Sequence, residues 1–210
     1  MPKTELSGFE ELASIDFFSQ KVLADVSKCK VDVNKIRYKP FGVDDISKLY
    51  EVNLDDHTFV FDTSFYLSYA IENYLGSRVA IDEYGEIIGY LLGTVTWTCR
   101  EMPKAHISVL TVTYPYRSTG VAHNLMRYFE EAAFALGAMY VDLFVDQTNG
   151  RAIKFYKNRN YKIENVIEHY YGLNKDAYQM VLCRPKNLHN YVVISDENSL
   201  ETACGGRFGL

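Results

Sequence analysis

The sequence lacks most of the features that would place a chain in a membrane, metal-binding or secreted class. Its 210 residues contain no run of about 18 apolar side chains, so we expect no transmembrane helix. Its four cysteines form neither a C-x-x-C pair nor a Cys/His ligand spacing; they are Cys29, Cys99, Cys183 and Cys204. This scatter predicts reduced thiols of an intracellular protein and no metal site.

Strong charge and targeting signals are missing as well. The net charge of −5 argues against nucleic acid as the main partner. No arginine precedes Arg37, and the acidic residues Glu5, Glu10, Glu11 and Asp16 are unlike a transit peptide. A signal-peptide core is also missing. We therefore expect a cytoplasmic protein that contacts neither nucleic acid nor a membrane directly.

The most informative stretch that is present covers residues 108–122, S-V-L-T-V-T-Y-P-Y-R-S-T-G-V-A. A β-branched run with a period of two leads through a proline turn into a long amphipathic pattern. The first N–H groups of a helix have no intrahelical partner and carry partial positive charge. Arg117 adds a formal charge, and Gly120 lets the backbone approach an anion closely. The stretch therefore predicts a site for the phosphates of a cofactor.

Periodicity divides the chain into three parts. Residues 1–35 form a helical extension whose apolar residues fall at spacings of three and four; they are Leu12, Ile15, Phe18, Val22 and Val26. Residues 36–184 form the domain, with the order β-α-α-β-β-β-α-β-α-β-β. Residues 185–210 are a tail that we expect to be poorly packed or disordered at its end. The order predicts an α/β fold with a mixed sheet and a parallel crossover through the helix at Gly120.

The expected elements follow from the same patterns. Strands are expected at 35–41, 78–81, 87–98, 106–113, 139–145, 161–170 and 177–183, and helices at 44–54, 65–73, 120–136 and 149–159. In the helix at 44–54, the inward residues would be Ile46, Leu49, Tyr50 and Leu54. Gly137 would end the long helix, and Thr148 or Asn149 would cap the one after it.

These residues together resemble a known superfamily. Arg117-x-x-Gly120-x-Ala122 after a central strand is similar to the pyrophosphate turn of GNAT acetyltransferases, which use acetyl-CoA. Further matches resemble the catalytic subunits of the NatB family: Asn53-Leu54-Asp55, Phe65-Tyr66-Leu67, Val141-Asp142-Leu143-Phe144-Val145, Asn149, Tyr156-Lys157, Tyr170-Tyr171 and Asp176-Ala177-Tyr178-x-Met180. The resemblance covers residues 36–183 and implies the GNAT fold, a central mixed sheet flanked by helices.

The resemblance implies a protein N-terminal α-amino acetyltransferase that acts on nascent chains starting Met-Asp, Met-Glu, Met-Asn or Met-Gln. It also implies a large helical auxiliary subunit and the ribosome as partners. Three positions depart from the family pattern. Ser118 replaces a basic residue, Phe59 stands where a glutamate is usual, and Ser108 replaces a threonine.

Two alternatives remain open. One is a GNAT acetyltransferase for a different peptide or for a small amine such as a polyamine. The other is a non-catalytic module that binds CoA or a protein partner. An aromatic loop and a tyrosine pair favour a peptide, whereas the intact Arg117–Ala122 turn together with Tyr156 favours catalysis.

For the cofactor, the resemblance implies a splay between the two central strands. The exposed strand backbone would hold pantetheine, with the Leu110 N–H as oxyanion donor. Tyr156 would donate a proton to the leaving sulfur, and Asn149 would both cap its helix and contact CoA or the substrate backbone. The expected cofactor-binding residues are Leu110, Thr111, Val112, Arg117, Ser118, Thr119, Gly120, Val121, Ala122, His123, Asn149 and Tyr156. Among these, we interpret His123 as a neutral scaffold residue.

For the peptide, two roles remain open for His106. It is either a general base, acting directly or through water, or a structural or peptide-binding histidine that contacts the second substrate residue. Phe59, Phe61 and Tyr66 would form an apolar wall for an initiator methionine, although Tyr66 also fits a core position. The expected substrate-binding residues are Phe59, Phe61, Tyr66, His106, Ser108, Tyr170 and Tyr171.

Overall fold

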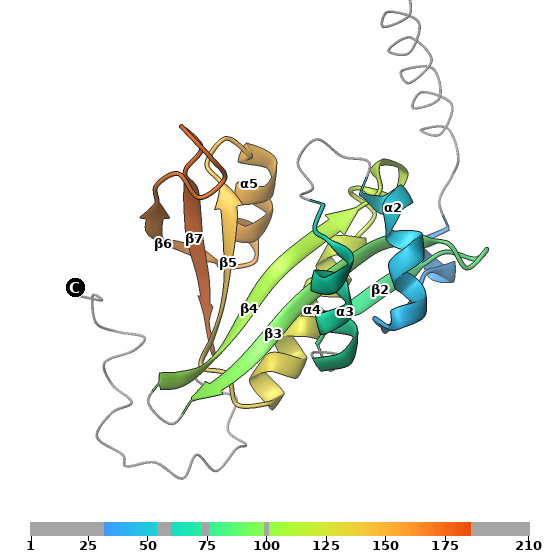
Figure 1. Ribbon diagram of the computed structural model, residues 1–210, viewed down its shortest axis with the longest axis horizontal. Coiled ribbons are helices and arrows are strands. Elements are labelled where there is room, and N and C mark those ends of the chain that lie inside the picture. The colour runs from blue at the N-terminus through green and yellow to red at the C-terminus, as the bar shows by residue number, and fades with distance from the viewer. Residues whose placement is uncertain (1–31, 54–59, 73–75, 99–100, 186–210) are drawn as a thin grey trace, which may run out of the picture.

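The computed structural model describes residues 32–53, 60–72, 76–98 and 101–185, and it consists of one sheet with helices on both faces (Figure 1). The strands are β1 Arg37–Pro40, β2 Arg78–Ile81, β3 Ile87–Thr98, β4 Glu101–Val112, β5 Tyr140–Asp146, β6 Lys162–Ile167 and β7 Ala177–Cys183. The helices are η1 Val33–Lys35, η2 Val43–Lys48, α2 Leu49–Val52, α3 Thr63–Glu72, η3 Tyr114–Tyr116, α4 Val121–Ala135 and α5 Gly150–Asn158. The N-terminal helix expected within residues 1–31, Leu54, Phe59 and the tail beyond residue 185 lie outside the described residues.

The seven described strands lie in the order β1-β2-β3-β4-β5-β7-β6. All neighbouring pairs are antiparallel except β4 and β5, which are parallel and are connected through α4. This confirms the predicted mixed sheet and its single crossover. Among the described residues, no helix is both long and apolar enough to span a membrane.

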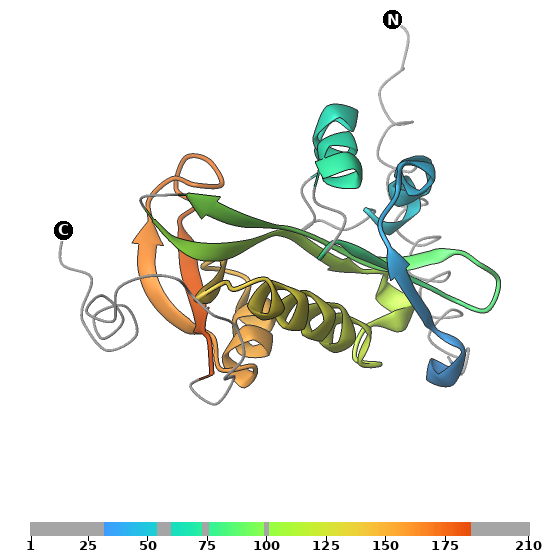
Figure 2. The ribbon, with the colours of Figure 1, turned by 90° about the horizontal axis from the view of Figure 1, so that it is seen from below.

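Each face of the sheet has its own hydrophobic core. In the edge-on view of Figure 2, α4 lies on one side of the sheet and α3 on the other. On one face, α4 packs its buried stripe against the sheet through Val121, Leu125, Phe129 and Ala133. On the other face, η2, α2 and α3 pack against β2, β3 and β4. Gly137, at φ +93°, ends α4 as predicted, because glycine adopts this left-handed conformation without steric cost.

The helix predicted at 44–54 is different in the structure. It is a 3-10 helix, η2, followed by the single α-turn of α2. Its inward residues are therefore three apart, Ile46, Leu49 and Val52, because a 3-10 helix has three residues per turn. The prediction that Tyr50 faces inward is wrong, since Tyr50 is 75% exposed.

The central strand β4 begins five residues earlier than predicted. Pro103, expected to flank the strand, lies inside it. The β3–β4 register shifts nearby, between Thr96 and Thr98, and proline is tolerated in a sheet at such irregularities. The Pro103 carbonyl also accepts a hydrogen bond from the Met139 N–H at 2.7 Å, which ties the start of β5 to β4.

A second irregularity in β4 inserts Ser108 as an extra residue. Leu92 on β3 pairs with Val109 and Gly93 pairs with Ile107, so Ser108 has no partner of its own. The bulge reverses the alternation of side chains along the strand. Ala105 and Ile107 face the α4 core before the bulge, whereas Leu110 and Val112 face it afterwards.

Gly93 lies opposite this bulge and lets α4 approach the sheet. A Cβ built at Gly93 would overlap the Phe129 ring and would lie 2.8 Å from the His106 carbonyl oxygen. We expect Gly93→Ala to lower the free energy of unfolding by about 2 kcal/mol, since overpacking a filled core costs about 1–3 kcal/mol. Gly150→Ala is the control, because a Cβ at Gly150 meets nothing within 4 Å. Equal melting temperatures for the two variants would contradict this packing.

Candidate active site

The site begins where β4 and β5 separate. Their parallel pairing covers Lys104–Ile107 and Tyr140–Leu143 and ends there, although both strands continue. Beyond that point β4 pairs only with β3, and β5 pairs with β7. The predicted splay is therefore confirmed, and Leu110, Thr111 and Val112 lie along it. Their contacts with a cofactor stay a prediction.

The turn after β4 leads into an exposed helix start. Thr119 Oγ1 donates to the Tyr116 carbonyl at 2.6 Å, and Arg117 Nε donates to the Val112 carbonyl at 2.9 Å. Ser118 (φ +64°) and Gly120 (φ +93°) are both left-handed. No side chain caps the N-terminus of α4, so the N–H groups of its first turn are available to an external acceptor.

Arg151 is a residue that the sequence reasoning missed. It lies in the first turn of α5, whose start follows β5 just as the start of α4 follows β4. Because β4 and β5 are parallel, both helix starts lie at the same edge of the sheet. Burial lowers the pKa of Arg117, and the charge of Arg151 lowers it further. Two guanidinium groups therefore lie near each other at the open end of the splay.

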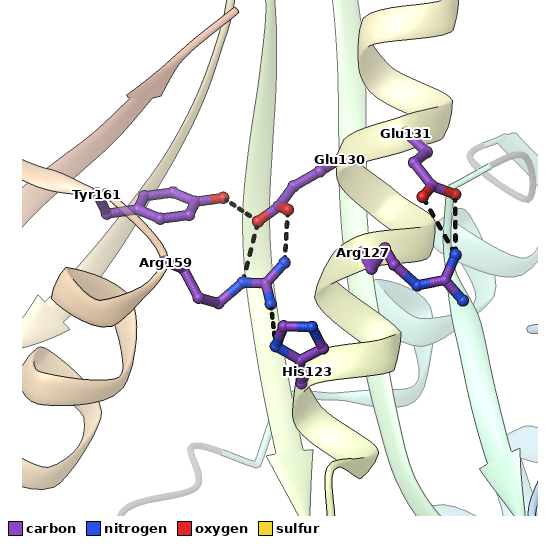
Figure 3. Close-up of polar contacts among 6 residues, drawn as sticks. All are labelled: His123, Arg127, Glu130, Glu131, Arg159 and Tyr161. Atoms are coloured by element: carbon purple, nitrogen blue, oxygen red, sulfur yellow. Dashed lines mark hydrogen bonds and ion pairs between the residues drawn. The ribbon is translucent and has the colours of Figure 1, made fainter. Parts of the chain in front are cut away.

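His123 belongs to a polar cluster that joins α4 to the end of α5 (Figure 3). Its Nδ1 atom lies 2.6 Å from Arg159 Nη1. Arginine is a donor only, so Nδ1 must be the acceptor, which is consistent with a neutral His123. Arg159 Nη2 also binds Glu130 Oε2 at 2.6 Å, and the Tyr161 hydroxyl donates to Glu130 Oε1 at 3.1 Å. The contact of His123 with phosphate stays a prediction.

Tyr156 lies on α5 and is buried against Phe155 and Tyr161. Burial raises its pKa above the ordinary value for tyrosine, and Tyr171 raises it further, so the hydroxyl keeps its proton at neutral pH. We find no hydrogen-bond partner for this hydroxyl among the described residues. Asn149 caps the same helix as predicted, with Oδ1 accepting from the Ala152 N–H at 3.0 Å. Its contact with CoA or the substrate backbone stays a prediction.

The other face of the splay carries polar and aromatic side chains in place of a helix. The Val141, Leu143 and Val145 side chains of β5 face the α4 core, so Asp142 and Phe144 point to the opposite face. His106 lies beside Asp142 in register, and its Nδ1 atom is 2.7 Å from Asp142 Oδ1. We call this surface of β4, β5 and β7 the open face.

On one side of the open face stands an aromatic row from α3 and the segment before it. Phe61 stacks on Phe65 with ring centroids 3.9 Å apart, and Phe65 contacts Tyr69 at 4.8 Å. The Tyr69 hydroxyl hydrogen-bonds Ser108 Oγ at 2.6 Å, which joins the row to the β4 bulge. Tyr66 lies beneath the row in the core, where its hydroxyl accepts from the Phe61 N–H at 3.3 Å. Tyr66 therefore helps to fix the position of Phe61 through this hydrogen bond.

On the other side stand Tyr170 and Tyr171. They follow β6, which ends at Ile167, so they lie in a turn instead of closing the strand as predicted. The bend lets both rings gather at Phe144. Tyr170 lies 4.7 Å from that ring, and the Tyr171 hydroxyl donates to the Phe144 carbonyl at 3.1 Å.

Burial raises the pKa of both tyrosines, to about 12 for Tyr171. Asp142 and Tyr69 raise the pKa of Tyr170 further, which places its hydroxyl near the aromatic row as well as near β5. Both tyrosines are therefore neutral hydrogen-bonding groups near pH 7.

Comparison with known proteins defines the class to which this fold and site belong. The profile of the acetyltransferase (GNAT) family matches residues 46–161, more than half of the chain. The chain therefore belongs to the acetyltransferase (GNAT) family, whose members transfer an acetyl group from acetyl-CoA. The predicted fold and family are both confirmed.

Within this family, the chain is similar to catalytic subunits of N-terminal acetyltransferase complexes. It is 32% identical over 150 residues to the catalytic subunit of the N-terminal acetyltransferase B complex of Schizosaccharomyces pombe. The match covers 68% of this chain and 82% of that protein. It is 29% identical over 145 residues to the catalytic subunit of the N-terminal acetyltransferase A complex of the same organism, and this match covers 68% of this chain and 82% of that protein. The NatB catalytic subunit of Chaetomium thermophilum, crystallised with a bisubstrate analogue, superimposes with a TM-score of 0.67 at 34% identity, over 70% of this chain and 86% of that one.

The Glu130–Arg159 pair yields a stability prediction. Its side chains are only 13% and 10% exposed, and removing one partner leaves a charge that is both buried and unpaired. We expect Glu130→Ala to lower the free energy of unfolding by about 3 kcal/mol. Glu131→Ala is the matched control on the same helix, since its pair with Arg127 is exposed and should contribute less than about 1 kcal/mol. Similar urea midpoints for the two variants would contradict this assignment.

Proposed function

We propose that this protein acetylates the α-amino group of protein N-termini with acetyl-CoA, preferring chains that begin Met-Asp, Met-Glu, Met-Asn or Met-Gln. The observation that carries the proposal is the splay of β4 and β5, which joins an uncapped helix start to a face lined by aromatic side chains. The relatives named as NatB catalytic subunits, one of them bound to a bisubstrate analogue, support the same reaction.

The cofactor end fits the phosphates of acetyl-CoA. The first-turn N–H groups of α4 and the guanidinium of Arg117 supply donors and positive charge, and Arg151 supplies a second guanidinium where Ser118 supplies none. Beyond the last rung of the β4–β5 pairing, the backbone of residues 110–112 would bind pantetheine as an added strand does. The Leu110 N–H would then stabilise the developing oxyanion.

Acetyl transfer also requires a neutral amine and a proton for the departing thiolate. An N-terminal amine has a pKa of about 7.7–8, so a minority is already neutral at pH 7. Tyr156 is suited to protonate the thiolate, because burial of its side chain raises the pKa of the hydroxyl, which therefore holds its proton at neutral pH. The methionine side chain would lie against the aromatic row, and the peptide backbone would pass Tyr170 and Tyr171.

We further propose a helical auxiliary subunit and, through it, the ribosome as partners. The solved NatB relatives are described as complexes. In this chain, exposed apolar side chains gather on η2, α2, α3 and the segment just before α3; they are Val43, Tyr50, Val60, Leu67 and Ile71. An exposed apolar set of this kind is typical of a protein-binding surface.

The decisive experiment is acetyl-CoA turnover on a peptide panel. We expect Met-Asp and Met-Glu peptides to give kcat/KM at least tenfold above Met-Leu, Ser- and Ala-starting peptides and above spermidine. A preference for Met-Leu would overturn the NatB-type assignment, and a preference for spermidine would favour a small-amine enzyme. CoA binding without turnover on any substrate would favour a non-catalytic module.

Arg151 provides a test of the cofactor end. We expect Arg151→Ala to weaken CoA binding about fivefold and to flatten its salt dependence, because an exposed charge near an anion contributes about 1 kcal/mol. Lys154→Ala removes the same charge one turn further along α5 and serves as the control. Calorimetric titration that gives equal affinities for both variants would exclude Arg151 from the phosphate site.

A further inference from the structure

A row of hydrogen-bonded polar side chains crosses four neighbouring strands and ends on the open face. Asn165 Nδ2 on β6 donates to Gln179 Oε1 on β7 at 2.8 Å. Gln179 Nε2 donates to Asp142 Oδ2 on β5 at 2.8 Å. Asp142 Oδ1 lies 2.7 Å from His106 Nδ1 on β4. We call these four residues the polar row; the function proposed above assigns no role to Asp142, Gln179 or Asn165.

The polar row determines which nitrogen of His106 carries a proton. An ionised carboxylate only accepts hydrogen bonds, so the nitrogen facing Asp142 must be an N–H donor. In a neutral imidazole the other nitrogen, Nε2, then holds a lone pair. Asp142 is only 7% exposed and is held in place by Gln179, so it cannot rotate freely to release His106.

The lone pair of Nε2 is not engaged by Asp142, and the His106 side chain lies on the open face. The His106 side chain is 30% exposed, and its ring contacts Phe144 at a centroid distance of 5.3 Å. The titratable groups that face the same side near it are Asp142 on β5, Lys104 two residues earlier on β4, Tyr69 on α3 and Tyr170 in the turn after β6. The pKa of each tyrosine is raised by burial, so both are neutral near pH 7.

We infer that Asp142, oriented by Gln179, is a positioning residue that makes His106 the proton acceptor for the substrate α-ammonium group. The inference rests on the proposed function, because it requires an amine substrate on the open face. Leu110 lies four positions after His106 on β4, and the bulge absorbs one of these four steps. Their backbones are thus about 10 Å apart along β4. An imidazole side chain and one water molecule span that distance.

The proton transfers balance as follows. One proton of the ammonium group passes through the water to His106 Nε2 and then to solvent. The freed lone pair forms the C–N bond with the thioester carbonyl carbon, and the C–S bond breaks. The second proton leaves the nitrogen and reaches the departing thiolate by way of the Tyr156 hydroxyl. The products are the amide, the free thiol and one proton in solvent.

The test compares the pH dependence of turnover of a Met-Asp peptide by the wild type and by Asp142→Asn. An asparagine at this position can donate to Nδ1, which moves the imidazole proton to Nε2 and removes the acceptor. We expect kcat at pH 7 to fall about 100-fold with KM changed less than threefold. At pH 9 the amine is already neutral, so the loss should shrink to below about tenfold.

A second variant keeps the test informative where Asp142→Asn unfolds. Gln179→Leu keeps the Asp142 carboxylate but removes the hydrogen bond that orients it. We therefore expect kcat at pH 7 to fall about tenfold, less than in Asp142→Asn, and this decrease should also become smaller at pH 9. Glu164→Gln, on an exposed position of β6, is the control and should match the wild type. A decrease in kcat that is equal at pH 7 and pH 9 would overturn the positioning role. A change in KM with kcat unaltered would overturn it as well. No turnover by the wild type would instead count against the proposed function.

Discussion

The end of the β4–β5 pairing at Ile107 and Leu143 is the constraint on which the remaining arrangement depends. One extra residue, Ser108, follows that last rung and changes which way the strand presents its side chains. Before the bulge, β4 is an ordinary central strand; after it, one edge of the strand no longer has β5 beside it. The helices that follow these strands, α4 and α5, begin at the same end of the opening. The anion-binding end and the open face therefore both result from the end of the β4–β5 pairing.

The two ends of the opening have opposite chemical character. At the cofactor end, positive charge comes from Arg117, Arg151 and the uncapped start of α4. At the peptide end, the buried carboxylate of Asp142 lies among amide and aromatic side chains, including Gln179 and Phe144. This separation suits a polyanionic donor that enters from one end and a cationic amine that enters from the other.

The sequence was sufficient for the features that depend on local periodicity. The β2 and β3 strands, the amphipathic helix α4 and the Asn149 cap all follow from spacing and from residue type, and they were predicted. The missed features depend on contacts between distant segments. The bulge at Ser108 changes no local pattern, and the His106–Asp142–Gln179 contacts join residues that are 36 and 37 positions apart. Tyr50 was misplaced because the 3-10 helix η2 precedes its short α-turn, and a continuous α-helical spacing from residue 44 does not represent that 3-10 segment.

Amide hydrogen exchange with and without acetyl-CoA tests the central claim most directly, because a ligand that binds the splay must cover its backbone. The account predicts that acetyl-CoA slows exchange at residues 109–112 and in the first turn of α4, residues 121–124. Exchange in β1 and β2 should remain unchanged. Protection confined to other segments, with residues 109–112 exchanging at the same rate in both states, would contradict the assignment of the β4–β5 opening as the acetyl-CoA site.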